Sequence, residues 1–139
     1  MTLDDELNIL HKVPFFCHIG PTELKLLAFA SDRIIFKAGQ DLFQQGEEAT
    51  SAYVILTGSA DIVQTTDDTV VKLGEAQPHS IVGEIALLYD NPRDTTVTST
   101  STVETLLITR DTFQKLMENF PGAMADILSS LGEQMIKAG

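Results

Sequence analysis

The middle of the sequence consists of short β-prone runs separated by turn residues, and this pattern constrains the possible fold most strongly. The runs span residues 34–36, 53–56, 60–63, 70–73, 96–98 and 103–108. Turns are predicted at Gly39, Gly46, Gly58, Asp67-Asp68 and Gly74. Short strands with glycine-rich turns at this spacing predict an antiparallel barrel or jelly roll.

Helical patterns flank this β region on both sides. Thr2 and Asp5 form a capping-box pattern ahead of leucines at helical spacing, and Gly20-Pro21 opens a second helix. After Arg110, two further apolar stripes are separated at Pro121. The stripe residues are Leu24, Leu27, Ala28, Phe113, Leu116, Met117, Met124, Ile127, Leu128, Leu131 and Met135. We therefore expect a single, mainly β domain with flanking helices, divided into segments 1–32, 33–109 and 110–139.

Charge and composition exclude several classes of function. The 139 residues include 9 Lys+Arg and 20 Asp+Glu, a formal charge of −11. Such a chain repels polyanions, so nucleic acid is not an expected partner, although one arginine can still hold a small anion. No apolar run is long enough to span a membrane, and the acidic N-terminus does not resemble a secretory signal.

Cys17 is the only cysteine, which excludes an intrachain disulfide. Its position beside Phe15 and Phe16 predicts a buried, small apolar side chain rather than a reactive thiol. A single cysteine fits a reducing compartment, so a cytoplasmic location is expected.

Residues 81–97 contain the best candidate for a binding site. Gly83 leads into a short apolar segment that Asn91-Pro92 ends, and a short helix there would present free N–H groups to an anion. A glycine lets a ligand approach the backbone closely. Arg93 lies where it could fold back and hold a phosphate with two hydrogen bonds, and Glu84 could accept bonds from a sugar hydroxyl.

The sequence of these residues, Gly-Glu-Ile-Ala-Leu-Leu followed by Pro-Arg-x-x-Thr-Val, resembles the phosphate-binding cassette of cyclic nucleotide-binding domains. Segments 13–16, 42–47, 53–58 and 109–113 resemble the same family in the same order, so the resemblance covers nearly the whole chain. It implies an eight-stranded antiparallel β-roll, jelly-roll-like, with N-terminal helices. A cassette over 82–97 would contain a short helix, and hinge and lid helices would follow over 110–139.

The resemblance also implies a regulatory module that binds cAMP or cGMP. The sequence contains no Gly-x-Ser-x-Gly, His-Glu-x-x-His or Walker-type motif, and its histidines form no ligand pattern, so neither catalysis nor a metal site is expected. Arg93 and the N–H of Ala86 would bind the cyclic phosphate, and Glu84 with the Gly83 backbone would bind the ribose 2′-hydroxyl. The candidate ligand-binding residues are Val71, Val82, Gly83, Glu84, Ile85, Ala86, Arg93, Asp94, Thr95 and Thr96. Of these, Val71, Val82 and Thr96 are expected near the base, and Leu131, Met135 or Ile136 is expected to close over it as a lid.

Two positions depart from the family pattern. Val82 stands where phenylalanine is common, which is a modest change. Asp94 directly follows the arginine, at a position that is usually small or hydroxylated, and a carboxylate there opposes a bound phosphate. Asp94 can point to solvent, pair with Arg93 in the empty state, or accept bonds from the N–H edge of guanine and favour cGMP. The preferred base stays open.

Two rival interpretations remain. A degenerate member of the same fold would bind no nucleotide and act as an interaction or dimerisation module, and Asp94 is the feature that favours it. A metal-dependent barrel enzyme of the cupin type would need clustered histidines, whereas His11, His18 and His79 are far apart in the sequence. In the sensor interpretation, the signal passes through the C-terminal helices to an effector domain or partner outside this chain.

Overall fold

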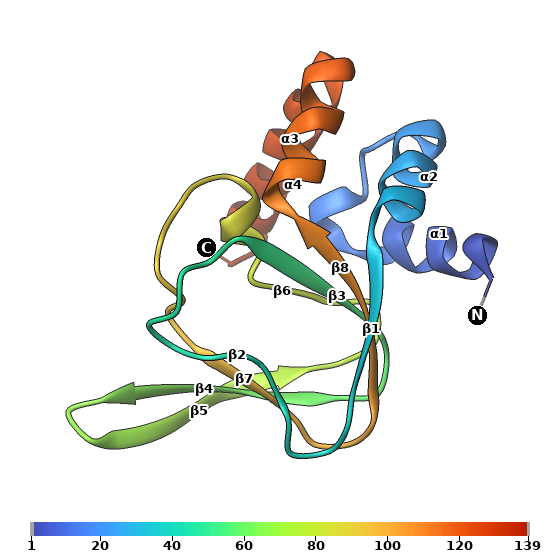
Figure 1. Ribbon diagram of the computed structural model, residues 1–139. Helices are drawn as coiled ribbons and strands as arrows, with labels where there is room; N and C mark the ends of the chain where they lie inside the picture. The colour runs from blue at the N-terminus through green and yellow to red at the C-terminus, as the bar shows by residue number, and fades with distance from the viewer. Residues whose placement is uncertain (1, 139) are drawn as a thin grey trace.

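Eight strands form two antiparallel four-stranded sheets, and the helices gather at one end of the molecule (Figure 1). This computed structural model describes residues 2–138, with side chains described as far as residue 132. One sheet has the order β1 (Asp32–Phe36), β8 (Val103–Thr109), β3 (Ser51–Thr57) and β6 (Ile81–Val82). The other has the order β2 (Asp41–Phe43), β7 (Thr96–Ser99), β4 (Ala60–Thr66) and β5 (Thr69–Ala76). The mainly antiparallel β-roll with flanking helices is confirmed.

The α-helices lie where the periodicity predicted helices, and a short 3-10 helix that was not predicted follows the first of them. These helical segments are α1 (Leu3–Lys12), η1 (Pro14–Phe16), α2 (Pro21–Ala30), α3 (Arg110–Asn119) and α4 (Pro121–Ala138). The capping box of α1 is present: the Asp5 N–H donates to Thr2 Oγ1 at 3.2 Å, and the Thr2 N–H donates to Asp5 Oδ2 at 3.0 Å. The short helix expected inside the β region is a 3-10 helix, η2 (Glu84–Leu87), which ends well before Asn91.

Strand β3 has apolar residues on both of its faces, and each face belongs to a different core. Successive side chains of a strand point to opposite sides of the sheet. Ala52, Val54 and Leu56 pack against the helices, together with residues such as Phe15 and Phe113. Ile55 instead lies in the interior between the two sheets. The β-roll therefore has a filled interior and a second core beneath its helices.

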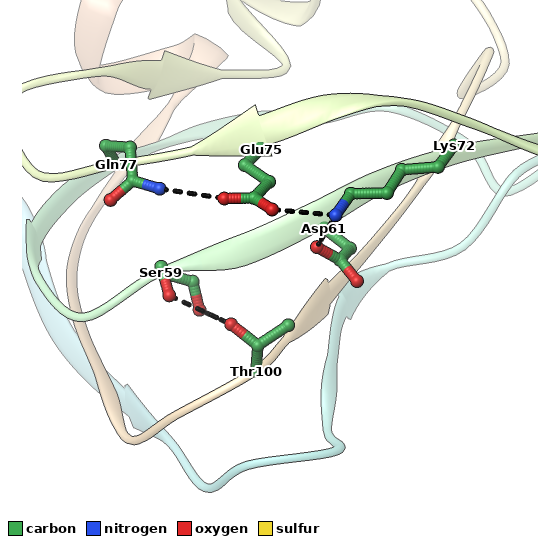
Figure 2. A network of polar contacts seen from close by, with 6 residues as sticks. All are labelled: Ser59, Asp61, Lys72, Glu75, Gln77 and Thr100. Atoms are coloured by element: carbon green, nitrogen blue, oxygen red, sulfur yellow. Dashed lines mark hydrogen bonds and ion pairs between the residues drawn. The ribbon is translucent and has the colours of Figure 1, made fainter.

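The β4–β5 hairpin extends beyond the rest of the β-roll (Figure 1). Lys72 of β5 forms ion pairs with Asp61 at 3.2 Å and Glu75 at 2.7 Å, as Figure 2 shows. At the base of β4, the hydroxyls of Ser59 and Thr100 are 2.9 Å apart. These contacts connect β4 both to its hairpin partner and to the chain that follows β7.

The predicted turn at Gly74 is wrong. Gly74 lies inside β5, opposite Ile62, where the pairing register between β4 and β5 shifts. Glycine is frequent at such irregularities because it lacks a side chain to pack and tolerates unusual backbone angles. Gly74 does mark an irregularity of the backbone, but this irregularity is a bulge within a continuous strand rather than a turn between two strands.

The expectation that Cys17 is buried is also wrong. Cys17 is exposed, and its Sγ lies 3.5 Å from Ser130 Oγ on α4. It follows the buried Phe16 at the end of a 3-10 turn, which directs it away from the core. Leu128 is 58% exposed, whereas its neighbour Ile127 is fully buried in the helical core.

Strand β8 continues directly into α3 without an intervening residue. Thr109 ends the strand and caps the helix, because its Oγ1 accepts a hydrogen bond from the Thr112 N–H at 3.1 Å. The Arg110 N–H donates to the Thr50 carbonyl at 2.9 Å, which fixes the start of the helix beside the β2–β3 loop. No helix among the described residues combines the length and apolar character needed to cross a membrane.

Candidate functional site

Gly83 makes the turn from β6 into η2 and lies against Arg93. Its φ of +74° is in the left-handed region, which glycine adopts without the strain that a Cβ would bring. A Cβ at this position would overlap Nη1 of Arg93 and lie 3.3 Å from the Phe43 ring. Both the backbone conformation and the neighbouring guanidinium therefore require a glycine.

Arg93 is a buried cation that forms no ion pair with any described residue. Its side chain is 7% exposed, and its Cζ lies 4.1 Å from the centroid of the Phe43 ring. Nη2 makes one long hydrogen bond of 3.4 Å to Ser51 Oγ. Within the described part of the chain, Nε and Nη1 are buried and have no hydrogen-bond partner. Most buried polar groups in proteins have hydrogen-bond partners, so these two unpaired donors are the most unusual feature of the site.

Burial lowers the pKa of Arg93, and the nearby charge of Glu47 opposes this shift. A guanidinium nevertheless stays protonated in proteins, so burial leaves the positive charge in place and only poorly solvated. The aromatic face of Phe43 offsets part of that cost through a cation–π contact. An anion that reached Nε and Nη1 would offset far more, since a guanidinium can donate two parallel hydrogen bonds to one phosphate or carboxylate.

The backbone at Arg93 is held against the β2–β3 loop. The Arg93 N–H donates to the Glu47 carbonyl at 2.8 Å, and its carbonyl accepts from the Gly46 N–H at 2.9 Å. An isolated bridge pairs Glu48 with Pro92. These bonds fix the arginine independently of η2, so the cavity has one wall from the loop and another from the 3-10 helix.

A cavity of about 200 Å³ opens at this place. It is smaller than the roughly 300–1,000 Å³ of a typical complete ligand pocket, so it can enclose only the charged part of a larger ligand. The lining residues are Phe43, Ala49, Gly83, Glu84, Ile85, Ala86, Asn91, Pro92, Arg93, Asp94 and Thr95. Seven of the ten predicted ligand-binding residues are in this set.

Three predicted residues lie elsewhere. Val82 is buried in the interior of the β-roll, and Val71 is 47% exposed on the edge strand β5. The Thr96 Oγ1 accepts a hydrogen bond from the Gln45 N–H at 2.9 Å in a separate open depression. Because successive residues of an extended chain alternate sides, Thr95 can face the cavity only if Thr96 faces away from it.

The C-terminal residues do not cover the cavity within the described part of the chain. Leu131 is partly buried and packs against the helical core, away from the cavity lining. The other two lid candidates, Met135 and Ile136, lie outside the described side chains.

The Ala86 N–H, expected to bind an anion, already donates to the Gly83 carbonyl at 3.1 Å. The N–H groups of Glu84 and Ile85 come before this first bond of the 3-10 helix. Among the N–H groups at the start of η2, those of Glu84 and Ile85 are therefore left without an intrahelical acceptor, whereas that of Ala86 has one.

Asp94 is exposed at the rim of the cavity. Within the described residues it forms no ion pair with the adjacent Arg93, so the alternative in which it neutralises the arginine is not observed. Its backbone carbonyl accepts a hydrogen bond from Gln64 Nε2 at 3.2 Å, which connects the rim to β4.

Arg110 connects the start of α3 to the cavity wall. Its Nε donates to the Ala86 carbonyl at 2.7 Å, and its Nη2 donates to the carbonyls of Ala49 and Tyr89. A weaker ion pair with Asp90 spans 3.9 Å. The Arg110 guanidinium thus connects both walls of the cavity, η2 and the β2–β3 loop, to α3. This helix continues directly from β8, an inner strand of its sheet.

Sequence reasoning did not identify Phe43, Ser51 or Arg110 as residues of the site. Ser51 and Arg93 are 42 positions apart, and their contact arises from the fold rather than from a local pattern. Phe43 is the last residue of a three-residue strand whose alternation is too short to show which way its ring points. Arg110 was recognised in the sequence as the start of a helix, but the backbone carbonyls to which it donates could not be predicted.

Within the described chain, no group of three or more His, Cys, Asp or Glu side chains is arranged to hold a metal ion.

Comparison with known proteins agrees with the geometry. The family profile described as "Cyclic nucleotide-binding domain" matches residues 33–120, and the chain belongs to this family. The cAMP-dependent protein kinase regulatory subunit of Dictyostelium discoideum is 33% identical over 113 residues. That match includes 78% of this chain and 35% of the relative, so the chain spans about a third of the relative's length.

Two solved structures show the same fold. A cyclic nucleotide-binding-like protein from Brucella abortus is 34% identical, with a TM-score of 0.74 over 83% of this chain and 99% of that one. The regulatory domain of Toxoplasma gondii PKA, crystallised with cAMP, is 25% identical, with a TM-score of 0.78 over 82% of this chain and 44% of that one.

Proposed function

We propose that this chain is a regulatory domain that binds cAMP or cGMP, with the cyclic phosphate on Arg93. The observation that carries the proposal is the buried guanidinium whose Nε and Nη1 have no hydrogen-bond partner among the residues that the structure describes. A cyclic phosphate is a monoanion with two exocyclic oxygens, and it matches the two parallel donors of a guanidinium. Family membership and a relative crystallised with cAMP support the same ligand class.

The remaining groups of the cavity suit a ribose. Glu84 lines the cavity on the η2 side and can accept a hydrogen bond from the 2′-hydroxyl, beside the Gly83 backbone. Since the cavity holds about 200 Å³, phosphate and ribose would fill it and the base would lie outside. Thr95 and Asp94 are the polar side chains at the rim that the base would meet first. Contacts of the base with Val71, Val82 or Thr96 stay predictions.

In the proposed mechanism, the ligand signal leaves the cavity through Arg110. A phosphate that draws η2 toward Arg93 moves the Ala86 carbonyl, which Arg110 holds at 2.7 Å. Because β8 and the Thr50 carbonyl hold the start of α3 in place, the pull on the Arg110 side chain tilts α3 about that start, and the C-terminal helices shift between two populated arrangements. An effector domain or partner outside this chain would respond to that shift.

Isothermal titration calorimetry with cAMP, cGMP and non-cyclic 5′-AMP tests the proposal. We expect binding of at least one cyclic nucleotide at micromolar or lower concentration, no comparable binding of 5′-AMP, and loss of binding in Arg93→Ala. Lys37→Ala is the matched control, because it removes an exposed cation from the loop that follows β1. Absence of heat with both cyclic nucleotides would overturn the proposal and favour the rival, an interaction module of the same fold that binds no nucleotide.

A further inference from the structure

An apolar groove lies between α2 and α3, on the helical end of the molecule and separate from the nucleotide cavity. It has a volume of about 420 Å³, and a second hollow of about 210 Å³ adjoins it between α1 and α2. Leu26 and Phe29 line both hollows and form the ridge that joins them. Phe29 is 80% exposed and Leu26 is 47% exposed.

Such exposure is unusual for a phenylalanine beside a groove. Single exposed apolar residues are ordinary, but apolar side chains that gather around a concave surface mark sites of association. Leu116 and Phe120 form the opposite wall from α3 and its end. Leu26, Phe29 and Ala30 share one face of α2, at the i, i+3, i+4 spacing that suits a helix lying alongside.

The charged side chains that line the two hollows are positive, although the chain as a whole is acidic. Among the described residues that line the two hollows, Lys25 and Lys115 are the only charged side chains, although the chain has a formal charge of −11. Lys115 also pairs with Asp111 on its own helix at 3.2 Å. Both partners of that pair are well exposed, so the pair is weak and Lys115 can exchange it for a carboxylate on a partner.

We propose that this groove binds an amphipathic helix of a partner protein, with apolar residues in the two hollows and acidic residues beside Lys25 and Lys115. A helix fits because the walls are themselves helices, which offer no unpaired backbone edge to an extended peptide. A lipid surface does not fit, because an anionic membrane would be repelled by the remaining acidic surface. A short acidic helix carries far fewer charges than a membrane, and its repulsion by the acidic surface is screened beyond about 8–10 Å at physiological salt, whereas the two short-range lysine contacts persist.

The test uses the whole chain without nucleotide, so its outcome is independent of the function proposed above. The probe is a fluorescently labelled, stapled helical peptide of about 18 residues, with leucines at i, i+3, i+4 and i+7 and glutamates flanking them. A matched peptide has lysine in place of each glutamate. Fluorescence anisotropy in 0.15 M salt gives both dissociation constants.

We expect the glutamate peptide to bind at least about tenfold more tightly than the lysine peptide, and Phe29→Ala to weaken its binding at least about tenfold. Ile35→Ala is the matched control, because Ile35 is 63% exposed on β1 and lies outside the groove, and it should change binding less than twofold. The double variant Lys25→Glu/Lys115→Glu should reverse the preference between the two peptides. The three variants replace only exposed side chains, and thermal melting verifies that each variant folds.

Three results would overturn the proposal. The first is absence of binding by the glutamate peptide, and the second is equal weakening by Phe29→Ala and Ile35→Ala. The third is a dimer in sedimentation velocity that Phe29→Ala dissociates, since it would assign the groove to a second copy of this chain.

Discussion

A side chain on Gly83 would overlap the guanidinium of Arg93, so this glycine provides the space in which the buried cation sits. The pair is a single structural unit: the turn that begins η2 has the left-handed φ of +74°, and the arginine fills the volume that a Cβ would take.

Gly83→Ala should therefore impair both stability and ligand binding. A non-glycine residue at this φ costs about 1–3 kcal/mol of folding free energy, and the displaced guanidinium should weaken cyclic nucleotide binding at least about tenfold. Gly39→Ala is the matched control, because Gly39 also has a left-handed φ of +89° but nothing lies within 4 Å of the added Cβ. Chemical denaturation and calorimetry should show a stability loss in both variants and a binding loss only in Gly83→Ala. Equal effects on binding would contradict the prediction.

Arg93→Met should stabilise the ligand-free protein while abolishing binding. Methionine keeps much of the side-chain volume against Phe43 and removes a buried cation without a counter-ion. We expect a gain of about 1–2 kcal/mol in the free energy of unfolding, measured in urea without nucleotide. A loss of similar size would show that the cation–π contact outweighs the cost of burying the charge.

Arg110→Lys should loosen the cavity wall although the charge is retained. A lysine ammonium cannot reach the Ala86, Ala49 and Tyr89 carbonyls in the fixed fork geometry of a guanidinium. Unfolding free energy should fall by about 1–3 kcal/mol, and cyclic nucleotide affinity should fall about tenfold. Gln114→Ala, an exposed change on the same helix, is the control. A lower melting temperature with unchanged affinity would mean that Arg110 is only structural.

Asp94→Asn should raise the affinity for cAMP and cGMP by a similar factor of a few-fold, and more strongly at low salt. The exposed carboxylate at the rim opposes the phosphate through a screened charge–charge interaction. Titrations at two ionic strengths measure both effects. A selective loss of cGMP affinity would contradict this expectation and place Asp94 at the base, which is the alternative that the sequence left open.

The α1 capping box gives one pH-dependent prediction. Hydrogen bonds from the backbone and side chain of Thr2 lower the pKa of Asp5. A carboxyl with a depressed folded-state pKa contributes stability that is fully present above its unfolded value, near 4, and is lost as the pH falls through the folded value. Asp5→Asn should therefore melt at a lower temperature than the wild type at pH 7, and the difference should disappear in strong acid. A constant difference at all pH values would contradict the prediction.

Much of the β architecture was predictable because most strands contain a run of β-prone residues long enough to be recognised in the sequence. All six runs lie within strands, whereas β2 and β6, with three and two residues, were not among those runs. Gly74 shows the limit of turn signals: a glycine that permits a bulge inside β5 looks the same in the sequence as one that ends a strand.

The site was predictable where its residues are close in the sequence. Gly83, Glu84 and Arg93 belong to one segment, and the structure places all three around one cavity. The environment of Arg93 was not predictable, because Phe43 and Ser51 reach it from strands far away in the sequence. The hydrogen bond between Thr96 and Gln45, outside the cavity lining, was not predictable either, because the side to which each of Thr95 and Thr96 points becomes clear only when the neighbouring strand is known.

The direct continuation of β8 into α3 limits how the helix can move. Strand β8 is hydrogen-bonded on both sides, to β1 and β3, so the near end of the helix cannot slide along its axis. Pivoting about Thr109 is the motion that remains. The ten residues of α3 span about 15 Å, and a tilt of about 10° would carry Asn119 through about 2.6 Å. A small rotation of α3 beside the cavity would therefore widen or narrow the groove between α2 and α3, because the displacement grows with distance from Thr109.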